Sequence, residues 1–211
     1  MHRLPDVLDA ADPSRASDLA TDRKERILAA AADLVAGKGY HAVSVADIGA
    51  AAGVTGPAIY RHFPGKPAVL VALFDRAIDQ LVAEAHRIAG QNQGVERALS
   101  ALVDGQVGFV VDDRVLAQVY YNEIHNLPEG DALRLRRKQR LYLEEWVYLV
   151  SELRPELDGA DVRSTVHAAI GAIQSALFHS VEGSTTRLSR VLTDAAHAIL
   201  SPSPPTTKES T

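Results

Sequence analysis

The chain of 211 residues is long enough to bury a substantial core, either in one unit or in a small unit followed by a larger one. Its formal net charge of −5 excludes a uniformly basic polyanion binder, so any contact with nucleic acid has to come from a local patch. The absence of cysteine excludes disulfides and thiolate metal sites, and it fits a reducing compartment.

Both ends of the chain lack helical periodicity. Residues 1–20 contain two prolines and several aspartates, and residues 201–211 read Ser-Pro-Ser-Pro-Pro-Thr-Thr-Lys-Glu-Ser-Thr. Such segments bury too little apolar surface to fold, so we expect a disordered arm and a disordered tail. Because the chain has neither a signal-peptide core nor an uncharged apolar run of 18 residues, we expect a cytoplasmic protein without a membrane partner.

Between these ends the pattern predicts an all-α protein, since no alternating β-branched run is long enough to start a sheet. The first helix is expected from Thr21, as its N-cap, to Gly37 or Gly39. A second, short helix opens at Ser44, which has the spacing of a capping box with Asp47.

The segment 44–63 has the form of a helix-turn-helix, with Gly53 relieving the tight turn between two short helices. We expect Thr55 to cap the second of these helices, and Ile59 and Phe63 to anchor it. A helix of this size fits the major groove of DNA. The candidate DNA-contacting residues are Ser44, Thr55, Gly56, Pro57, Tyr60, Arg61, His62 and Lys66. Residues 22–66 carry a net charge of +2 and the remainder −7, which favours this assignment over a mere packing module.

Residues 21–70 resemble the TetR/AcrR family of repressors. The similarity rests on Gly39-Tyr40, on Ser44-Val45-Ala46-Asp47-Ile48-Gly49-Ala50-Ala51-Ala52-Gly53-Val54, and on Ile59-Tyr60-Arg61-His62-Phe63 followed by Lys66 and Leu70. The resemblance implies a nine-helix homodimer whose first three helices bind DNA through Ser44, Thr55, Tyr60, Arg61, His62 and Lys66. Pro67 departs from the family, which usually has an acidic residue there, and this affects the start of the fourth helix.

A long fourth helix is expected after the segment Pro64-Gly65-Lys66-Pro67 and up to Gly90, with a buried stripe of Leu70, Leu73, Ala77, Leu81 and Ile88. Five further helices are expected at about 95–111, 114–126, 130–153, 160–181 and 186–200. We therefore predict two domains: a helix-turn-helix domain over 21–67, and an effector-binding and dimerisation domain over 68–200.

The last two expected helices carry the candidate dimer contact. Small residues form a strip that allows close approach of helices, and a second stripe faces it: Ala168, Ala172, Ser175 and Ala176, then Leu188, Leu192, Ala195 and Ile199. An ordinary intramolecular core is the alternative, and the resemblance favours the dimer.

Aromatic and polar residues mixed on helices of the larger domain indicate a pocket for a small molecule. The candidate apolar wall consists of Phe109, Tyr120, Tyr121, Trp146 and Phe178. The candidate polar groups are Asn122, Glu123, His125, Gln174 and His179. Core packing is the alternative for each residue, and residues 120–126 resemble acyl-CoA-responsive members of the family.

A dense basic cluster lies on the expected helix over 130–153: Arg134, Arg136, Arg137, Lys138 and Arg140. It could receive a phosphate or carboxylate of an effector. We favour a solvated helix face whose charges pair with neighbouring acidic residues, namely Glu129, Asp131, Glu144 and Glu145.

No pattern for catalysis or for a metal was found. Glu123 and His125 are two residues apart and point to different sides of a helix, while His167 and His179 are three turns apart. The sequence contains no HExxH motif, no orderable Ser-His-Asp set and no phosphate-cradling glycine loop. We therefore expect no enzyme, no metal and no cofactor.

Together these features predict a ligand-responsive repressor that binds a palindromic operator in double-stranded DNA as a homodimer. A small hydrophobic or acyl-type effector, such as an acyl-CoA, would release it. One alternative is a helix-turn-helix protein whose larger domain is a protein-interaction platform without a small ligand. A helical metal-dependent enzyme is a more distant one.

Overall fold

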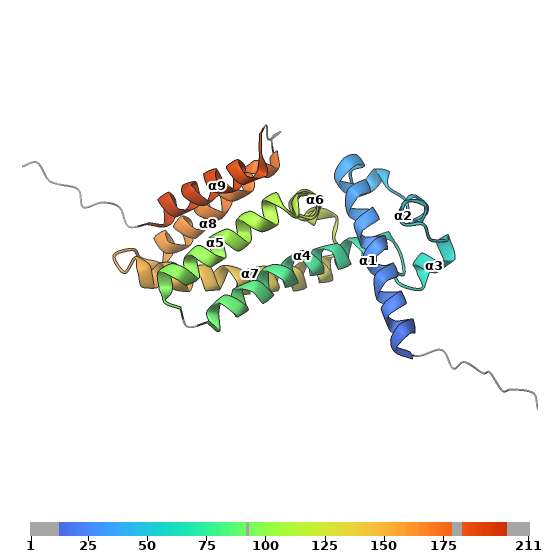
Figure 1. The fold of residues 1–211 in the computed structure, drawn as a ribbon, viewed down its shortest axis with the longest axis horizontal. Helices are drawn as coiled ribbons and strands as arrows, with labels where there is room; N and C mark the ends of the chain where they lie inside the picture. The colour runs from blue at the N-terminus through green and yellow to red at the C-terminus, as the bar shows by residue number, and fades with distance from the viewer. Residues whose placement is uncertain (1–12, 92, 179–182, 202–211) are drawn as a thin grey trace, which may run out of the picture. The chain divides into compact units, whose positions relative to one another are not determined.

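The computed structural model describes residues 13–91, 93–178 and 183–201. These residues form nine α-helices and three short 3₁₀ helices and contain no strand, which confirms the predicted all-α class (Figure 1). The chain divides after Val69 into two compact units, the head unit and the C-terminal unit.

The head unit is built around one long helix. Its elements are α1 (Pro13–Lys38), η1 (Tyr40–Ala42), α2 (Val45–Ala52), α3 (Gly56–Tyr60) and the first residues of α4 (Lys66–Ala89). Ile27, Ala31 and Val35 recur every four residues on α1 and are buried, as are Ile48 of α2 and Ile59 of α3. Since the three helices share this small core, α2 and α3 are held against α1.

The first helix starts earlier than the sequence pattern predicted. Residues 13–20 belong to α1, so the expected disordered arm is wrong for this stretch, and Thr21 lies inside the helix instead of capping it. Pro13 occupies the first helical position, where its missing N–H would have had no partner in any case. The predictions for residues 1–12 and for most of the expected tail, residues 202–211, lie outside the described residues.

The C-terminal unit is a bundle arranged around α5. Its elements after α4 are α5 (Val95–Val111), α6 (Arg114–Asn122), η2 (Ile124–Asn126), α7 (Glu129–Leu153), α8 (Gly159–Gln174), η3 (Ser175–Phe178) and α9 (Thr185–Leu200). Helices α8 and α9 pack side by side, α9 also packs on α5, and α7 contacts both α5 and α8 (Figure 1). The stripe predicted on α4, from Leu70 to Ile88, is buried.

Two of the predicted helices end before the sequence pattern does. The helix expected over 114–126 stops at Asn122, and η2 follows it. The helix expected over 160–181 changes to the tighter 3₁₀ form at Ser175. At this second boundary the buried side chains Ile173, Ala176 and Leu177 keep the spacing of α8, so the buried face of the helix continues into η3.

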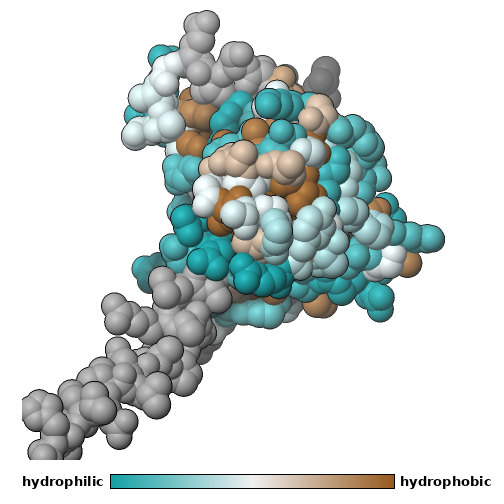
Figure 2. Space-filling model, turned by 90° about the vertical axis from the view of Figure 1, so that its right-hand side faces the viewer, coloured by the Kyte–Doolittle hydropathy of each residue, from teal (hydrophilic) through white to brown (hydrophobic). Residues whose placement is uncertain are grey.

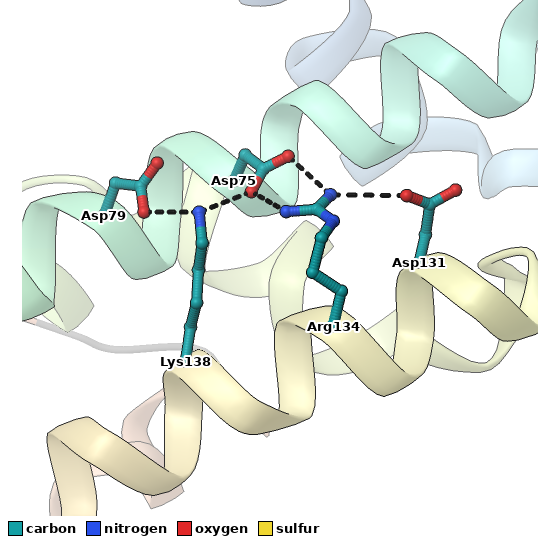
Figure 3. A network of polar contacts seen from close by, with 5 residues as sticks. All are labelled: Asp75, Asp79, Asp131, Arg134 and Lys138. Carbon is teal, nitrogen blue, oxygen red and sulfur yellow. Dashed lines mark hydrogen bonds and ion pairs between the residues drawn. The ribbon is translucent and has the colours of Figure 1, made fainter.

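An ion-pair network joins α4 to α7 (Figure 3). Both amino groups of Arg134 bind the carboxylate of Asp75, at 2.6 and 2.7 Å, and one of them lies 3.3 Å from Asp131. The ammonium of Lys138 lies 2.8 Å from Asp75 and 2.7 Å from Asp79. The hydrogen bonds from Arg134 lower the pKa of Asp75 despite its partial burial.

This network changes the interpretation of the basic cluster on α7. Arg134 and Lys138 pair chiefly with acidic residues of α4, and of the partners expected from the sequence only Asp131 takes part. Glu144 binds Arg163 of α8 instead, at 2.8 Å. Two of the five basic residues therefore stabilise the contact between helices, which leaves them less suited to an effector phosphate.

The described residues were also compared with what a membrane span and a metal site require. No helix among them is both long and apolar enough to cross a membrane. Their histidines, aspartates and glutamates likewise form no group of three or more that could hold a metal ion.

Candidate functional site

The start of α2 is fixed by a reciprocal pair of hydrogen bonds. The backbone N–H of Asp47 donates to the Ser44 hydroxyl oxygen at 3.1 Å, and the backbone N–H of Ser44 donates to the Asp47 carboxylate at 2.9 Å. This is the capping box that the spacing predicted. The Ser44 hydroxyl also donates to the Asp47 carboxylate at 2.6 Å, and this bond together with that from the Ser44 backbone N–H lowers the pKa of Asp47. The helix N-terminus, with its partial positive charge, is thereby held at the surface.

Two glycines shape the turn between α2 and α3. Gly53 has a φ of 65°, in the left-handed region that glycine adopts readily, and it ends α2. At Gly49 the requirement is space, because a Cβ there would lie 3.1 Å from both the Ile59 side chain and the Val54 carbonyl oxygen. The turn conformation and the close contact together set the position of α3 against α2.

Helix α3 ends at Tyr60, and together with the three residues after it this helix shows the two faces that the sequence predicted. Ile59 and Phe63 are buried, whereas 59% of Tyr60 is exposed and Arg61 is also exposed. Thr55 takes the N-cap position as expected, but its side chain makes no capping hydrogen bond. A buried apolar anchor therefore holds a short helix whose phenol and guanidinium groups face solvent.

The other predicted DNA-contacting residues lie on the same unit. Ser44, Thr55 and Pro57 are exposed, and Gly56, His62 and Lys66 are half-buried. Figure 2 views the molecule from the side on which α2 and α3 lie in Figure 1, and this face is mostly hydrophilic with a central area of paler and brown residues. The structure thus gathers the predicted residues on one compact unit.

Lys66 has partners that the sequence pattern did not indicate. Its ammonium donates to the carbonyl oxygen of Tyr40 at 2.9 Å and lies 4.2 Å from the centre of the Tyr40 ring. These contacts tie the start of α4 to the segment after α1. An ammonium has three N–H donors, so this position still allows a contact with phosphate.

In the C-terminal unit an aromatic cluster surrounds Tyr120. The Tyr120 ring makes edge-to-face contacts with Phe74 at 5.3 Å, with Phe109 at 6.4 Å and with Tyr121 at 5.1 Å between ring centres. Desolvation raises the pKa of Tyr120, so the phenol stays protonated. Three of the predicted wall residues are thus brought together by α5 and α6.

Next to this cluster lies a small internal space, the inner cavity, of about 20 Å³. Six neutral polar residues border it: Gln106, Tyr120, Tyr121, Gln139, Tyr142 and Gln174. Gln174 donates to the Tyr121 hydroxyl at 2.7 Å, and Tyr142 donates to the Gln106 carbonyl at 2.9 Å. Burial raises the pKa of Tyr121 to about 12, although the neighbouring amides of Gln106 and Gln174 offset part of the rise.

Gln106 and Tyr142 were missed by the sequence analysis. Gln106 is completely buried on α5, where its neighbours at helical spacing are the core residues Leu102, Val103 and Val110. A glutamine within an apolar stripe is a usable signal, because a buried amide needs hydrogen-bond partners. Tyr142 sits on α7 beside Trp146, with ring centres 6.2 Å apart.

Several predicted pocket residues do not border the inner cavity. Trp146 is fully buried in the core, and Glu123 binds Asn126 at 2.6 Å where α6 gives way to η2. His125 is exposed, and so is 69% of Phe178, which continues the exposed face formed by Ala168, Gly171 and Ser175 at helical spacing. Neither His125 nor Phe178 lines the inner cavity of the described chain. His179 lies outside the described residues.

A larger hollow, the groove, opens beside the inner cavity between α4, α5 and α7. Its volume is about 480 Å³, and Gly105 and Gly108 of α5 contribute to its wall. The lining residues are Gln80, Leu81, Ala83, Glu84, Arg87, Leu102, Gly105, Gly108, Phe109, Asp112, Asp113 and Tyr142. Leu81 and Tyr142 line both the groove and the inner cavity.

The outer face of α8 and η3 carries the predicted small-residue strip only in part. Ala168 and Ser175 are exposed and Ala172 is half-buried, but Ala176 is fully buried inside the unit. On the facing stripe, Leu192 is buried, and Leu188, Ala195 and Ile199 are half-buried. The large exposed apolar residues Phe178 and Val191 lie on the same two elements, η3 and α9.

Residues 27–73 match the family model described as bacterial regulatory proteins, tetR family. The chain is 29% identical over 92 residues to the HTH-type transcriptional activator FasR of Mycolicibacterium smegmatis, a match that covers 44% of the chain and only 42% of FasR. Thus the chain spans less than half the length of this relative.

Solved structures resemble the chain over a longer range. A TetR-family transcriptional regulator from Bordetella parapertussis has a TM-score of 0.77 at 19% identity, covering 84% of this chain and 93% of that one. AibR, solved in complex with isovaleryl coenzyme A and operator DNA, has a TM-score of 0.70 at 18% identity, covering 81% and 96%. At such identities the likeness concerns the fold.

Proposed function

We propose that this chain is a regulator of the TetR family, a repressor that binds a palindromic operator as a homodimer and leaves it when a small effector enters the C-terminal unit. Its relatives are transcriptional regulators and not enzymes. The proposal has three parts: DNA recognition, dimerisation and release.

DNA recognition is assigned to α3 and the residues around it. The observation that carries this assignment is the contrast on α3 and the three residues after it, where Ile59 and Phe63 are buried while Tyr60 and Arg61 are exposed. A helix held in this way can enter the major groove and offer its phenol and guanidinium to base edges or phosphates. The N-terminus of α2 at Ser44 would meet a phosphate through its partial positive charge.

Dimerisation is assigned to the outer face of α8, η3 and α9. The apolar residues exposed there, Phe178 and Val191, and the small exposed residues Ala168 and Ser175 suit close helix packing between two copies. Two copies would present two copies of α3, and half-sites one DNA turn apart lie about 34–36 Å from each other.

Release is assigned to α4, because this helix begins in the head unit and continues into the C-terminal unit. An effector that binds beside α4 would favour one position of the helix and so change the separation of the two recognition helices. Allosteric coupling of about 1–3 kcal/mol, typical of such regulators, weakens DNA binding by about 5–150-fold. The complex of AibR with both an acyl-CoA and operator DNA supports this arrangement of two sites.

The test is selection of bound fragments from a library of genomic DNA with the purified full-length chain, followed by titration of the enriched duplex. We expect a palindromic sequence bound by a dimer at low ionic strength. If the protein shifts no duplex under these conditions, the DNA-recognition assignment is wrong. If it binds DNA but no small molecule releases it, the C-terminal unit is a protein-interaction platform instead.

A further inference from the structure

The inner cavity of the C-terminal unit offers hydrogen bonds but no charge. None of its lining residues is acidic, basic or a histidine; they are Ile78, Leu81, Gln106, Tyr120, Tyr121, Gln139, Tyr142, Leu143, Ile170 and Gln174. Tyr121 and Tyr142 are the two buried phenols beside Gln106. Desolvation raises the pKa of each phenol, so both stay neutral. An ionised ligand group would be buried here without a counter-charge and is therefore strongly disfavoured.

One donor in this cavity is still available. Gln106 is fully buried, and its carbonyl oxygen accepts from Tyr142 at 2.9 Å. Its amide nitrogen lies on the side of Tyr121 but completes no hydrogen bond of regular length and angle. A buried N–H without a partner is costly, so a ligand oxygen that accepts from Gln106 would gain the full benefit of that hydrogen bond.

The groove beside this cavity is acidic. Its lining contains the three acidic residues Glu84, Asp112 and Asp113 and a single basic residue, Arg87. Arg87 is already paired with Glu84, with one contact of 2.8 Å, so it offers little to a ligand anion. The rim therefore repels a polyanion such as the phosphates of coenzyme A.

The two spaces meet at Leu81 and Tyr142, which line both. The inner cavity alone, at about 20 Å³, has room for no more than a water molecule. The groove, at about 480 Å³, is within the range of small-molecule sites. A ligand in the groove that displaces the Tyr142 side chain would reach the amide of Gln106.

We propose that the effector is an uncharged carbonyl compound of low molecular mass, whose oxygen accepts a hydrogen bond from Gln106 while its apolar body occupies the groove, and that acyl-CoA thioesters and fatty carboxylates are excluded. This inference rests on the proposed function, because it names the ligand class of the same C-terminal unit. It also separates this chain from AibR, which was solved with a coenzyme A thioester.

The test compares three probes of equal chain length that differ in head-group charge: methyl decanoate, decanoate and decanoyl-CoA. Binding to the full-length protein is measured by thermal shift and by isothermal titration calorimetry. We expect methyl decanoate to raise the Tm by about 5–10 °C at a hundredfold excess over its Kd, and the two anionic probes to leave it unchanged. Tighter binding of decanoyl-CoA than of the ester overturns the proposal.

Two variants and one control locate the site. Gln106→Leu removes the donor and should weaken binding of methyl decanoate about tenfold or more. Gly105→Leu fills the groove wall with a good helix former, so it should abolish ester binding while the folded state is retained. Gly130→Leu, a helical position of α7 outside the groove lining, should leave ester binding unchanged.

A third variant tests the electrostatic part. Asp112→Asn removes one negative charge from the rim and should make decanoyl-CoA binding measurable or stronger, with little effect on the ester.

Ester binding that survives both Gln106→Leu and Gly105→Leu overturns the assignment of the site. Operator binding is measured separately without any probe. If the ester does not bind, only the proposed ligand class is rejected, and the result for DNA binding still stands. If the protein binds no duplex, the proposed function is rejected even if the ester binds.

Discussion

Gly49 of α2 lies so close to Ile59 of α3 that a Cβ on the glycine would stand 3.1 Å from the Ile59 Cδ1 atom and equally close to the Val54 carbonyl oxygen. The isoleucine side chain could shift, but the backbone carbonyl belongs to the turn that Gly53 closes. The distance between the two helices of the helix-turn-helix therefore depends on the missing side chain at position 49.

We expect Gly49→Ala to destabilise the head unit by about 1–3 kcal/mol, because overpacking exceeds the gain of about 1 kcal/mol in helix propensity. It should also weaken operator binding, since α3 is displaced. Urea unfolding and DNA titration measure the two effects. The matched control is Gly37→Ala on α1, where a Cβ would meet nothing within 4 Å, and this change should be neutral or stabilising. Equal stability of both variants would contradict the argument.

Tyr60→Ala and Arg61→Ala should each reduce operator affinity by about 1–3 kcal/mol while the fold is preserved, because both side chains are exposed. Fluorescence anisotropy at several salt concentrations measures this loss. If Arg61 binds a phosphate, its removal also lowers the salt dependence by about one unit of slope. Arg136→Ala, an exposed arginine of α7, serves as the control and should leave DNA binding unchanged. Wild-type affinity in both α3 variants would remove α3 from the site.

The pairing of Asp75 with Arg134 predicts a pH-dependent contribution to stability. The pKa of Asp75 is lowered in the folded state, so the pair stabilises the fold above the unfolded pKa of about 3.9 and loses its effect as the pH falls through the folded value. Asp75→Asn should lower the free energy of unfolding by about 1–2 kcal/mol at pH 7, a range that allows for solvent screening of the 28% exposed Asp75 side chain. Below about pH 4 this loss should become progressively smaller.

Chemical denaturation of wild type and Asp75→Asn across pH 3–7 checks this prediction. The control is Asp79→Asn, whose side chain is 57% exposed and has the single partner Lys138, and its effect should stay below about 1 kcal/mol. A difference between wild type and Asp75→Asn that does not shrink at low pH would show that the ion pair is not its source.

Phe178→Ser and Val191→Ser should shift the oligomer toward monomer and raise the dimer dissociation constant at least tenfold. In the single chain 69% of Phe178 and 54% of Val191 are exposed, so neither change should unfold the protomer. Sedimentation velocity gives the dissociation constant, and circular dichroism reports the fold. Tyr148→Ser is the control, because Tyr148 is 59% exposed but lies on α7. An unchanged dimer in both variants would place the interface elsewhere.

Several local features of the helix-turn-helix could be predicted from the sequence. The capping box at Ser44, the left-handed Gly53 and the anchoring pair Ile59 and Phe63 were all predicted and are present. Each depends on residues within a few positions of one another, so propensity and spacing are enough to infer them.

For the inner cavity and the groove, the sequence predicted some of the lining residues but not the hydrogen bonds between them. Phe109, Tyr120, Tyr121 and Gln174 were selected for their chemistry, but the bonds that organise them join Tyr142 to Gln106 and Gln174 to Tyr121, 36 and 53 residues apart. Phe178 was selected for its aromatic ring, although its spacing from Ala168, Gly171 and Ser175 places it on the exposed face of the helix.

The sequence by itself determined the helical class, the capping box of α2 and the buried anchor Ile59 of α3, because apolar periodicity, caps and glycines act within single helices and turns. Only the tertiary structure decided that Arg134 would bind Asp75, that Gln106 would face a cavity and that the groove beside it would be acidic. These properties arise where α4, α5 and α7 meet, and the relative rotation of packed helices follows from the fit of all their side chains at once.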